Sequence, residues 1–194
     1  MNEYILLYVS IILIILYLYL NKSNLKYIES GKTGTKYLVQ NNKFKKETAE
    51  LLEKVIINMY KLKMYLNKNI DKFPNFNKYI KQLDEKLNEE RTTIYENKEK
   101  SDLTSYSVNK GEEIVFCLKS KKSNKNHKIN TIMYVAIHEM AHLGCPEIGH
   151  TQLFNKIFKF FLQEAVKLNI YTYTNYSDEP IEYCGMVLTT NILN

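Results

Sequence analysis

Residues 134–150 read Tyr-Val-Ala-Ile-His-Glu-Met-Ala-His-Leu-Gly-Cys-Pro-Glu-Ile-Gly-His, and this stretch decides how the chain is interpreted. Its centre has the pattern H-E-x-x-H within an apolar segment of helical spacing. Residues four apart lie on one face of a helix, so His138 and His142 can both reach one Zn²⁺ at about 2.0–2.1 Å. Glu139 lies beside that face, where its carboxylate can act as general base toward a zinc-activated water. The pattern therefore predicts a catalytic zinc site.

A catalytic zinc needs a third protein ligand and one open position. His150 is the preferred candidate, because the helix ends soon after His142 and Gly149 lets the chain turn back toward the metal. Cys145 and Glu164 are the alternatives. The thiolate would weaken the Lewis acidity of the metal, and the carboxylate lies on the next predicted helix.

Along the chain, apolar residues recur at helical intervals in four segments and alternate in three shorter ones. The predicted helices cover residues 46–67, 75–90, 130–144 and 151–168, with a cap at Asn130-Thr131 for the third. The predicted strands cover residues 92–96, 103–108 and 113–118, with a hairpin turn at Asn109-Lys110-Gly111. This order predicts an α+β fold in which a small antiparallel sheet packs on helices.

The 194 residues suffice for one compact domain. The net charge is +6, but Arg91 is the only arginine, which argues against a dedicated nucleic-acid surface. The basic segment 119–128, including His127, is predicted to be a solvated loop. A protein or peptide substrate is therefore expected, and a protease acting on nucleic-acid-bound proteins is an alternative.

The cysteines are odd in number and far apart, at positions 117, 145 and 184. A domain of this size does not need covalent crosslinks to fold. No disulfide is therefore expected, Cys184 is interpreted as a small buried apolar residue, and a reducing compartment is the simpler assumption.

The N-terminus contains an uncharged apolar run over residues 4–20, which predicts a retained transmembrane helix. The domains are accordingly expected to be an anchor at 1–20, a juxtamembrane linker at 21–43 and the catalytic domain at 44–194. Lysines crowd the C-terminal flank of the run. By the positive-inside rule, the predicted single-pass protein would place its catalytic domain on the cytosolic side of a host or viral membrane.

The segment His138 to His142, followed by Gly149-His150 and Phe154, resembles the WLM and SprT-like zinc metallopeptidases. The wider stretch from Thr104 through Gly185 resembles a family of membrane-anchored metallopeptidases of large DNA viruses. The resemblance implies a zincin-like fold and zinc-dependent hydrolysis of peptide bonds.

In such a fold, strand 113–118 is expected to pair with an extended peptide. Tyr183 is a candidate hydrogen-bond donor to the oxyanion, with a packed core tyrosine as the alternative. Met186 is a candidate for the floor of the site. A catalytically silent, zinc-stabilised membrane scaffold is the alternative function, and the oligomeric state is left open.

Overall fold

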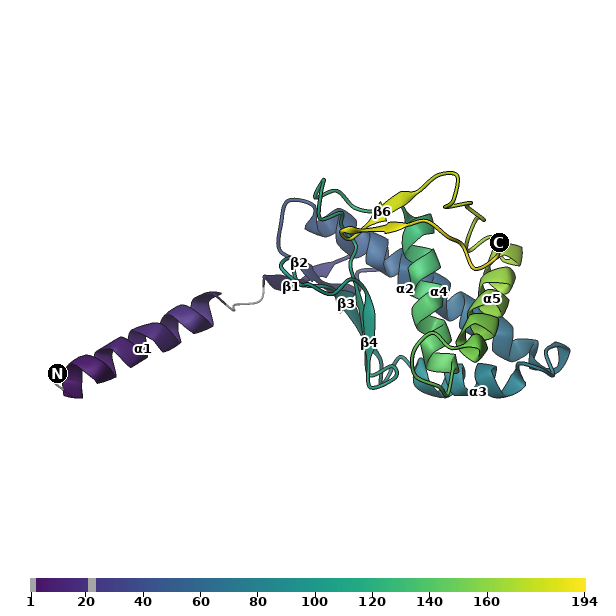
Figure 1. Cartoon of the computed structure of the whole chain (residues 1–194), viewed down its shortest axis with the longest axis horizontal. Helices are drawn as coiled ribbons and strands as arrows, with labels where there is room; N and C mark the ends of the chain where they lie inside the picture. Colours follow the sequence, from purple (N-terminus) through teal and green to yellow (C-terminus); the bar gives the residue numbers. More distant parts are fainter. Residues whose placement is uncertain (1–2, 21–23) are drawn as a thin grey trace.

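The computed structural model describes residues 3–20 and 24–194 and has an α+β architecture, as predicted (Figure 1). The elements in chain order are α1 (Glu3–Leu20), β1 (Leu25–Glu29), β2 (Lys36–Gln40), α2 (Lys45–Lys68), a 3₁₀ turn η1 (Ile70–Lys72), α3 (Asn77–Lys86), β3 (Thr93–Glu96), β4 (Tyr106–Val108), β5 (Glu113–Phe116), α4 (Ile129–Gly144), α5 (Gln152–Lys167), β6 (Ile181–Tyr183) and β7 (Met186–Leu188).

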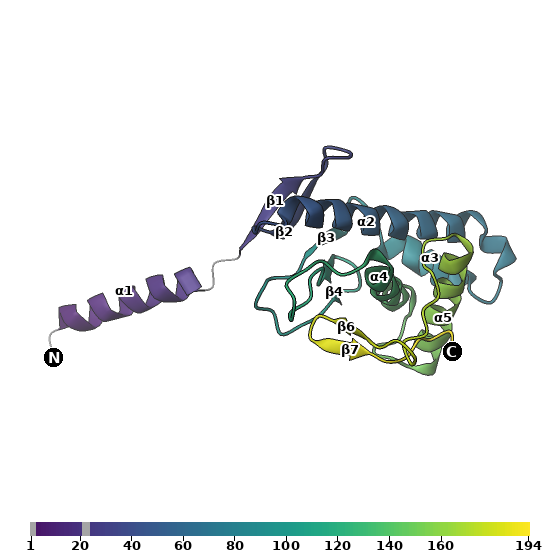
Figure 2. The ribbon, with the colours of Figure 1, turned by 90° about the horizontal axis from the view of Figure 1, so that it is seen from above.

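Helix α4 is the central element, and it lies between α2 and the β6–β7 hairpin (Figure 2). Most of its side chains are buried because it packs against α2, α3 and α5. The helix starts at Ile129, and the predicted cap at Asn130-Thr131 is wrong. The Asn130 side chain is used elsewhere: its Oδ1 accepts a hydrogen bond from Thr172 N at 2.8 Å, and its Nδ2 donates to Thr172 O at 2.9 Å. Asn130 thus ties the C-terminal segment to α4.

The main sheet has the order β3-β5-β4. The predicted all-antiparallel sheet is wrong, because β3 pairs with β5 in parallel and only β4 pairs with β5 antiparallel. The predicted turn is present, with positive φ at Asn109, Lys110 and Gly111. A side chain at Gly111 would bring its Cβ within 2.8 Å of Lys86 O, so this position requires glycine for space as well as conformation. Strand β5 is central and β4 forms one edge.

Residues 25–40, predicted to belong to a linker, form the antiparallel hairpin β1–β2 instead. Val39 is fully buried, and the Ser30 hydroxyl donates a hydrogen bond of 2.7 Å to Glu53 on α2. The hairpin is therefore part of the folded body. Residues 21–23 of the predicted linker lie outside the described residues.

Helix α1 forms where the apolar run predicted a helix, but the prediction of a membrane anchor is wrong. Its 18 residues include Glu3 and measure about 27 Å at 1.5 Å per residue, less than a hydrocarbon core of about 30 Å. Across residues 3–20 and 24–194, no helix combines the length and the apolar character that a bilayer crossing requires. The single-pass membrane location predicted from this segment is therefore wrong as well.

The cysteine prediction is also wrong, because Cys117 and Cys184 form a disulfide. The bond joins the end of β5 to the turn of the β6–β7 hairpin, two places that are distant in sequence and adjacent in the fold. Cys145 is free and buried. His127, predicted to be solvated, is half-buried: its ring lies 4.9 Å from that of Tyr183, and its Nε2 accepts a hydrogen bond from Cys184 N at 3.3 Å.

A buried ion pair joins the hairpin, the sheet and the basic loop. Lys119 Nζ lies 3.1 Å from Glu96 Oε1, with side-chain exposures of 4% and 0%, and Glu96 Oε2 accepts a hydrogen bond from Gln40 N. A Lys119→Met substitution leaves the carboxylate buried without its cation, so we expect the free energy of unfolding to fall by about 3–5 kcal/mol. Urea denaturation measures the change, with the exposed Lys122→Met as control. Equal stability of the two variants would contradict this prediction.

Candidate metal centre

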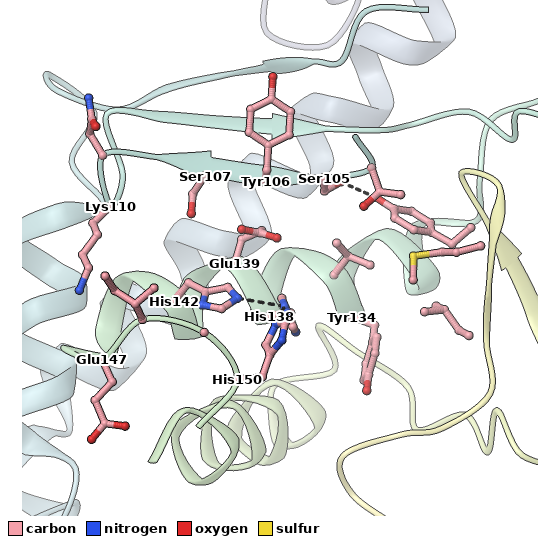
Figure 3. Close-up of a pocket in the computed structure, with 18 residues that line it drawn as sticks. Ser105, Tyr106, Ser107, Lys110, Tyr134, His138, Glu139, His142, Glu147 and His150 are labelled. Atoms are coloured by element: carbon pink, nitrogen blue, oxygen red, sulfur yellow. Dashed lines mark hydrogen bonds between the residues drawn. The ribbon is translucent and has the colours of Figure 1, made fainter. Parts of the chain in front are cut away.

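Three imidazole rings converge beside α4 (Figure 3). The Nε2 atom of His138 lies 3.1 Å from that of His142 and 3.0 Å from that of His150. One ligand atom from each of the three residues lies within 4.8 Å of the other two. The structure thus brings together the two helical histidines and the predicted third one.

Local sequence explains how each ring reaches this place. His138 and His142 are one turn apart on α4, and Gly149 has a φ of +81°, which lets the chain reverse before His150. Phe154, in the first turn of α5, stacks on the His142 ring at 4.2 Å and meets the His138 ring edge-on at 4.9 Å. This aromatic contact holds the two imidazoles in position.

The three nitrogens fit a zinc ion. Two ligands of a tetrahedral zinc at about 2.0–2.1 Å lie about 3.3 Å apart, close to the separations found between the His138 ring and its two neighbours. Burial, followed by the charges of the other two histidines, lowers the pKa of His138 to about 3. Burial, followed by His150 and Lys110, lowers the pKa of His142 to about 4. Both rings are therefore neutral near pH 7, which metal binding requires.

Glu139 lies next to the histidines on α4 and is buried, with an exposed fraction of 5%. Burial raises the pKa of its carboxyl to about 7, and a hydrogen bond with the Ser107 side chain opposes this rise. Such a value suits a group that takes and returns a proton near neutral pH, and a nearby cation would favour its ionised form. Figure 3 shows the Glu139 carboxyl pointing away from α4 toward Ser107, which lies on β4 at the opposite wall of the cleft.

The cleft over these residues has a volume of about 650 Å³. Strand β4 forms one wall, α4 with the turn 147–150 forms the other, and the β6–β7 hairpin closes one end. Within residues 24–194, β4 pairs with β5 alone, so its other edge is available to an extended chain. The predicted peptide-pairing strand, 113–118, is therefore wrong, because β5 already has a partner on each side.

Tyr183 borders the cleft, but its side chain is 1% exposed. Its hydroxyl shares a hydrogen bond of 2.6 Å with Ser105 Oγ, and Cys117 N donates a hydrogen bond of 3.0 Å to the same Ser105 Oγ. Burial raises the pKa of Tyr183 well above its ordinary value. These contacts describe a packed tyrosine that anchors the β6–β7 hairpin to Ser105, the residue directly before β4. The role of Tyr183 as a donor to the oxyanion stays a prediction.

Comparison with known proteins places the chain among viral proteins. Protein R325 of Acanthamoeba polyphaga mimivirus is 39% identical over 198 residues, an alignment that covers 100% of both chains. This chain belongs to the R325 family. This chain also aligns over a shorter stretch with protein 136R of invertebrate iridescent virus 6, which is 42% identical over 36% of this chain and 40% of that protein. Protein 042R of invertebrate iridescent virus 3 is 37% identical over 36% of this chain and 43% of that protein.

The predicted similarity to viral proteins is confirmed by these relatives. No family profile matches the chain. Among solved structures, Wss1 from Saccharomyces cerevisiae aligns with a TM-score of 0.35 and 18% identity, over 40% of this chain and 63% of that chain. A score this low does not establish a shared fold, so the zincin-like assignment of the R325 family member remains a prediction.

Glu164 and Cys145, the alternative third ligands of this R325 family member, lie apart from the histidine cluster. Glu164 is buried on α5, where it accepts hydrogen bonds from Lys167 Nζ at 2.6 Å and Tyr65 OH at 3.3 Å. Cys145 is buried just beyond the end of α4. In the part of the chain that the structure describes, neither residue joins the histidine cluster.

Several residues of the cleft were not predicted from sequence. Ser105 and Ser107 flank Tyr106, so alternation along a strand places both on one face, and this pattern could have identified them. Lys110 reaches the cleft from the turn after β4, and its Nζ donates a hydrogen bond of 2.7 Å to Pro146 O. Its position depends on the folded turn and has no local sequence signal.

Proposed function

We propose that this R325 family member is a zinc-dependent peptidase. One observation carries the proposal: three imidazole nitrogens converge beside a buried carboxylate in an open cleft, bordered by an edge of β4 that no other described strand pairs with. A structural zinc site would be expected to have four protein ligands and no adjacent acid, whereas three ligands leave a position for water or substrate. The donor set therefore favours catalysis over a purely structural role.

His138, His142 and His150 would hold the metal, which supplies polarisation of the scissile carbonyl and a lower pKa for the attacking water. The Glu139 carboxylate accepts the proton of this water and later donates it to the leaving amine. Ser107 orients the carboxylate through its hydroxyl. The free edge of β4 binds the substrate backbone as an added strand, which positions a peptide bond above the histidines.

Removal of the metal tests the proposal directly. The purified full-length chain is expected to contain one zinc ion per chain by elemental analysis and to cleave an unfolded protein such as reduced casein. Dialysis against a chelator should abolish cleavage, and one equivalent of zinc should restore it. Cleavage that persists in the metal-free chain would refute the proposal. Stoichiometric zinc with no cleavage of any unfolded protein would refute it too, and would support the scaffold function.

A further inference from the structure

The two ends of the cleft differ in chemistry. Lys110 and Glu147 are charged residues at the end near the β4–β5 turn (Figure 3), where Ile148 is an apolar residue that also lines the cleft. Met186, Leu188 and Val135 line the opposite end, and all three are apolar. A peptide bound along β4 therefore meets charged groups on one side of the histidines and an apolar surface on the other.

The apolar end is formed jointly by β7 and α4. Met186 and Leu188 are two residues apart on β7, so they point to the same face of the hairpin, and that face lines the cleft. Val187 lies between them and does not line the cleft. Val135 is one helical turn before His138, which places it beside the histidine cluster.

This surface is held firmly in place. The hairpin that carries it is joined to the body by the Cys117–Cys184 bond and by the contact of the Tyr183 hydroxyl with Ser105 Oγ. An isolated two-stranded hairpin is marginally stable, so these ties are what fix its distance from α4. A pocket between two fixed elements can select side chains by size.

The direction of β4 decides which residue of a substrate enters this pocket. The strand starts next to Ser105, at the apolar end, and leads into Lys110 at the charged end. Antiparallel pairing is the slightly more stable arrangement. A substrate paired in this way runs from the charged end to the apolar end, so the residue that follows the scissile bond faces Val135, Met186 and Leu188.

We propose that the cleft selects peptides with a large apolar side chain immediately after the scissile bond, and that Val135, Met186 and Leu188 form the pocket for it. This inference rests on the proposed peptidase function, and it adds the class of substrate. Burial of a leucine-sized side chain corresponds to about a 10- to 100-fold preference over glycine at that position.

Peptide cleavage measures the preference. The zinc-loaded full-length chain is incubated with a peptide mixture of defined sequence, and mass spectrometry identifies the residue after each cleaved bond. We expect leucine, phenylalanine and methionine to dominate there. A preference for large apolar residues before the bond, or equal cleavage at glycine, would overturn this inference while leaving the peptidase function intact. Absence of cleavage at any bond would overturn both.

Three variants test the pocket. Leu188→Glu should lower kcat/KM for leucine-containing peptides by at least about 10-fold, because a carboxylate replaces the apolar surface. Val135→Phe should fill the pocket and shift the preference toward alanine and glycine. Val187→Glu, on the same strand but away from the cleft, is the matched control and should leave the preference unchanged. Equal effects of Leu188→Glu and Val187→Glu would overturn the assignment.

A binding measurement provides a readout that does not depend on turnover. Fluorescein-labelled peptides that differ only in a central leucine or glycine are titrated into the Glu139→Gln chain, and anisotropy gives their dissociation constants. The leucine peptide should bind about 10-fold more tightly or better, and the Leu188→Glu substitution should remove the difference. Equal affinity of the two peptides for the Glu139→Gln chain would overturn the pocket.

Discussion

The Glu139→Gln protein should bind one zinc ion, as the parent chain does, and should lose peptide cleavage by about 10²- to 10⁴-fold. The amide has almost the same shape as the carboxylate, so the histidine cluster and the packing of α4 should be preserved. It cannot accept the proton of the attacking water or return one to the leaving amine. The loss is therefore expected in kcat, with little change in KM.

Initial rates on a fluorogenic peptide measure cleavage by the Glu139→Gln protein, and elemental analysis of the same sample measures its zinc content. Glu164→Gln is the matched control, because Glu164 is also a buried acid, on the neighbouring helix and outside the histidine cluster. It should retain zinc and activity. A Glu139→Gln chain with the parent rate would show that this carboxylate does not handle the proton.

The His150→Ala protein should bind zinc at least about 100-fold more weakly. Loss of an outer-shell partner of a zinc ligand already costs about 10- to 100-fold in affinity, and His150 would be a direct ligand. Because His150 lies on an exposed turn after α4, its replacement should leave the fold intact. The expected effect is therefore confined to the metal and to activity.

Competition with a chromophoric zinc chelator measures the affinity of the His150→Ala protein, and circular dichroism monitors its fold. Glu164→Gln serves again as the comparison, since it removes the charge of the rival ligand. If His150→Ala kept its zinc while Glu164→Gln lost it, the third ligand would be the Glu164 carboxylate. The prediction that His150 is the third zinc ligand would then be wrong.

Local patterns in the sequence predicted the parts of the fold that depend on local spacing. The apolar periodicity predicted both ends of α2, α4 and α5 to within one residue, because a helix repeats every 3.6 residues. Alternation and the Asn109-Lys110-Gly111 turn predicted β3 and the β4–β5 hairpin. The spacing of His138 and His142 likewise predicted a shared helical face.

Features that depend on contacts between distant segments were not predicted correctly. The parallel pairing of β3 with β5 has no local signal, and it decides which strand remains at the edge. The Cys117–Cys184 bond depends on the β6–β7 hairpin folding back over β5, across a separation of 67 residues. The linker interpretation of residues 21–43 rests on the polar, glycine-containing segment 30–35, which instead forms the turn between β1 and β2, and Val39 on β2 is fully buried.

The position of the disulfide in the sequence affects how the site can recover from unfolding. The segment between Cys117 and Cys184 contains all three histidines of the cluster and Glu139, so in the oxidised chain these groups belong to one covalent ring. A ring of this size removes entropy equivalent to about 4 kcal/mol from the denatured chain. Histidines confined in this way cannot drift as far apart as in an open chain. An oxidised chain should therefore recapture its metal through a smaller conformational search than a reduced one.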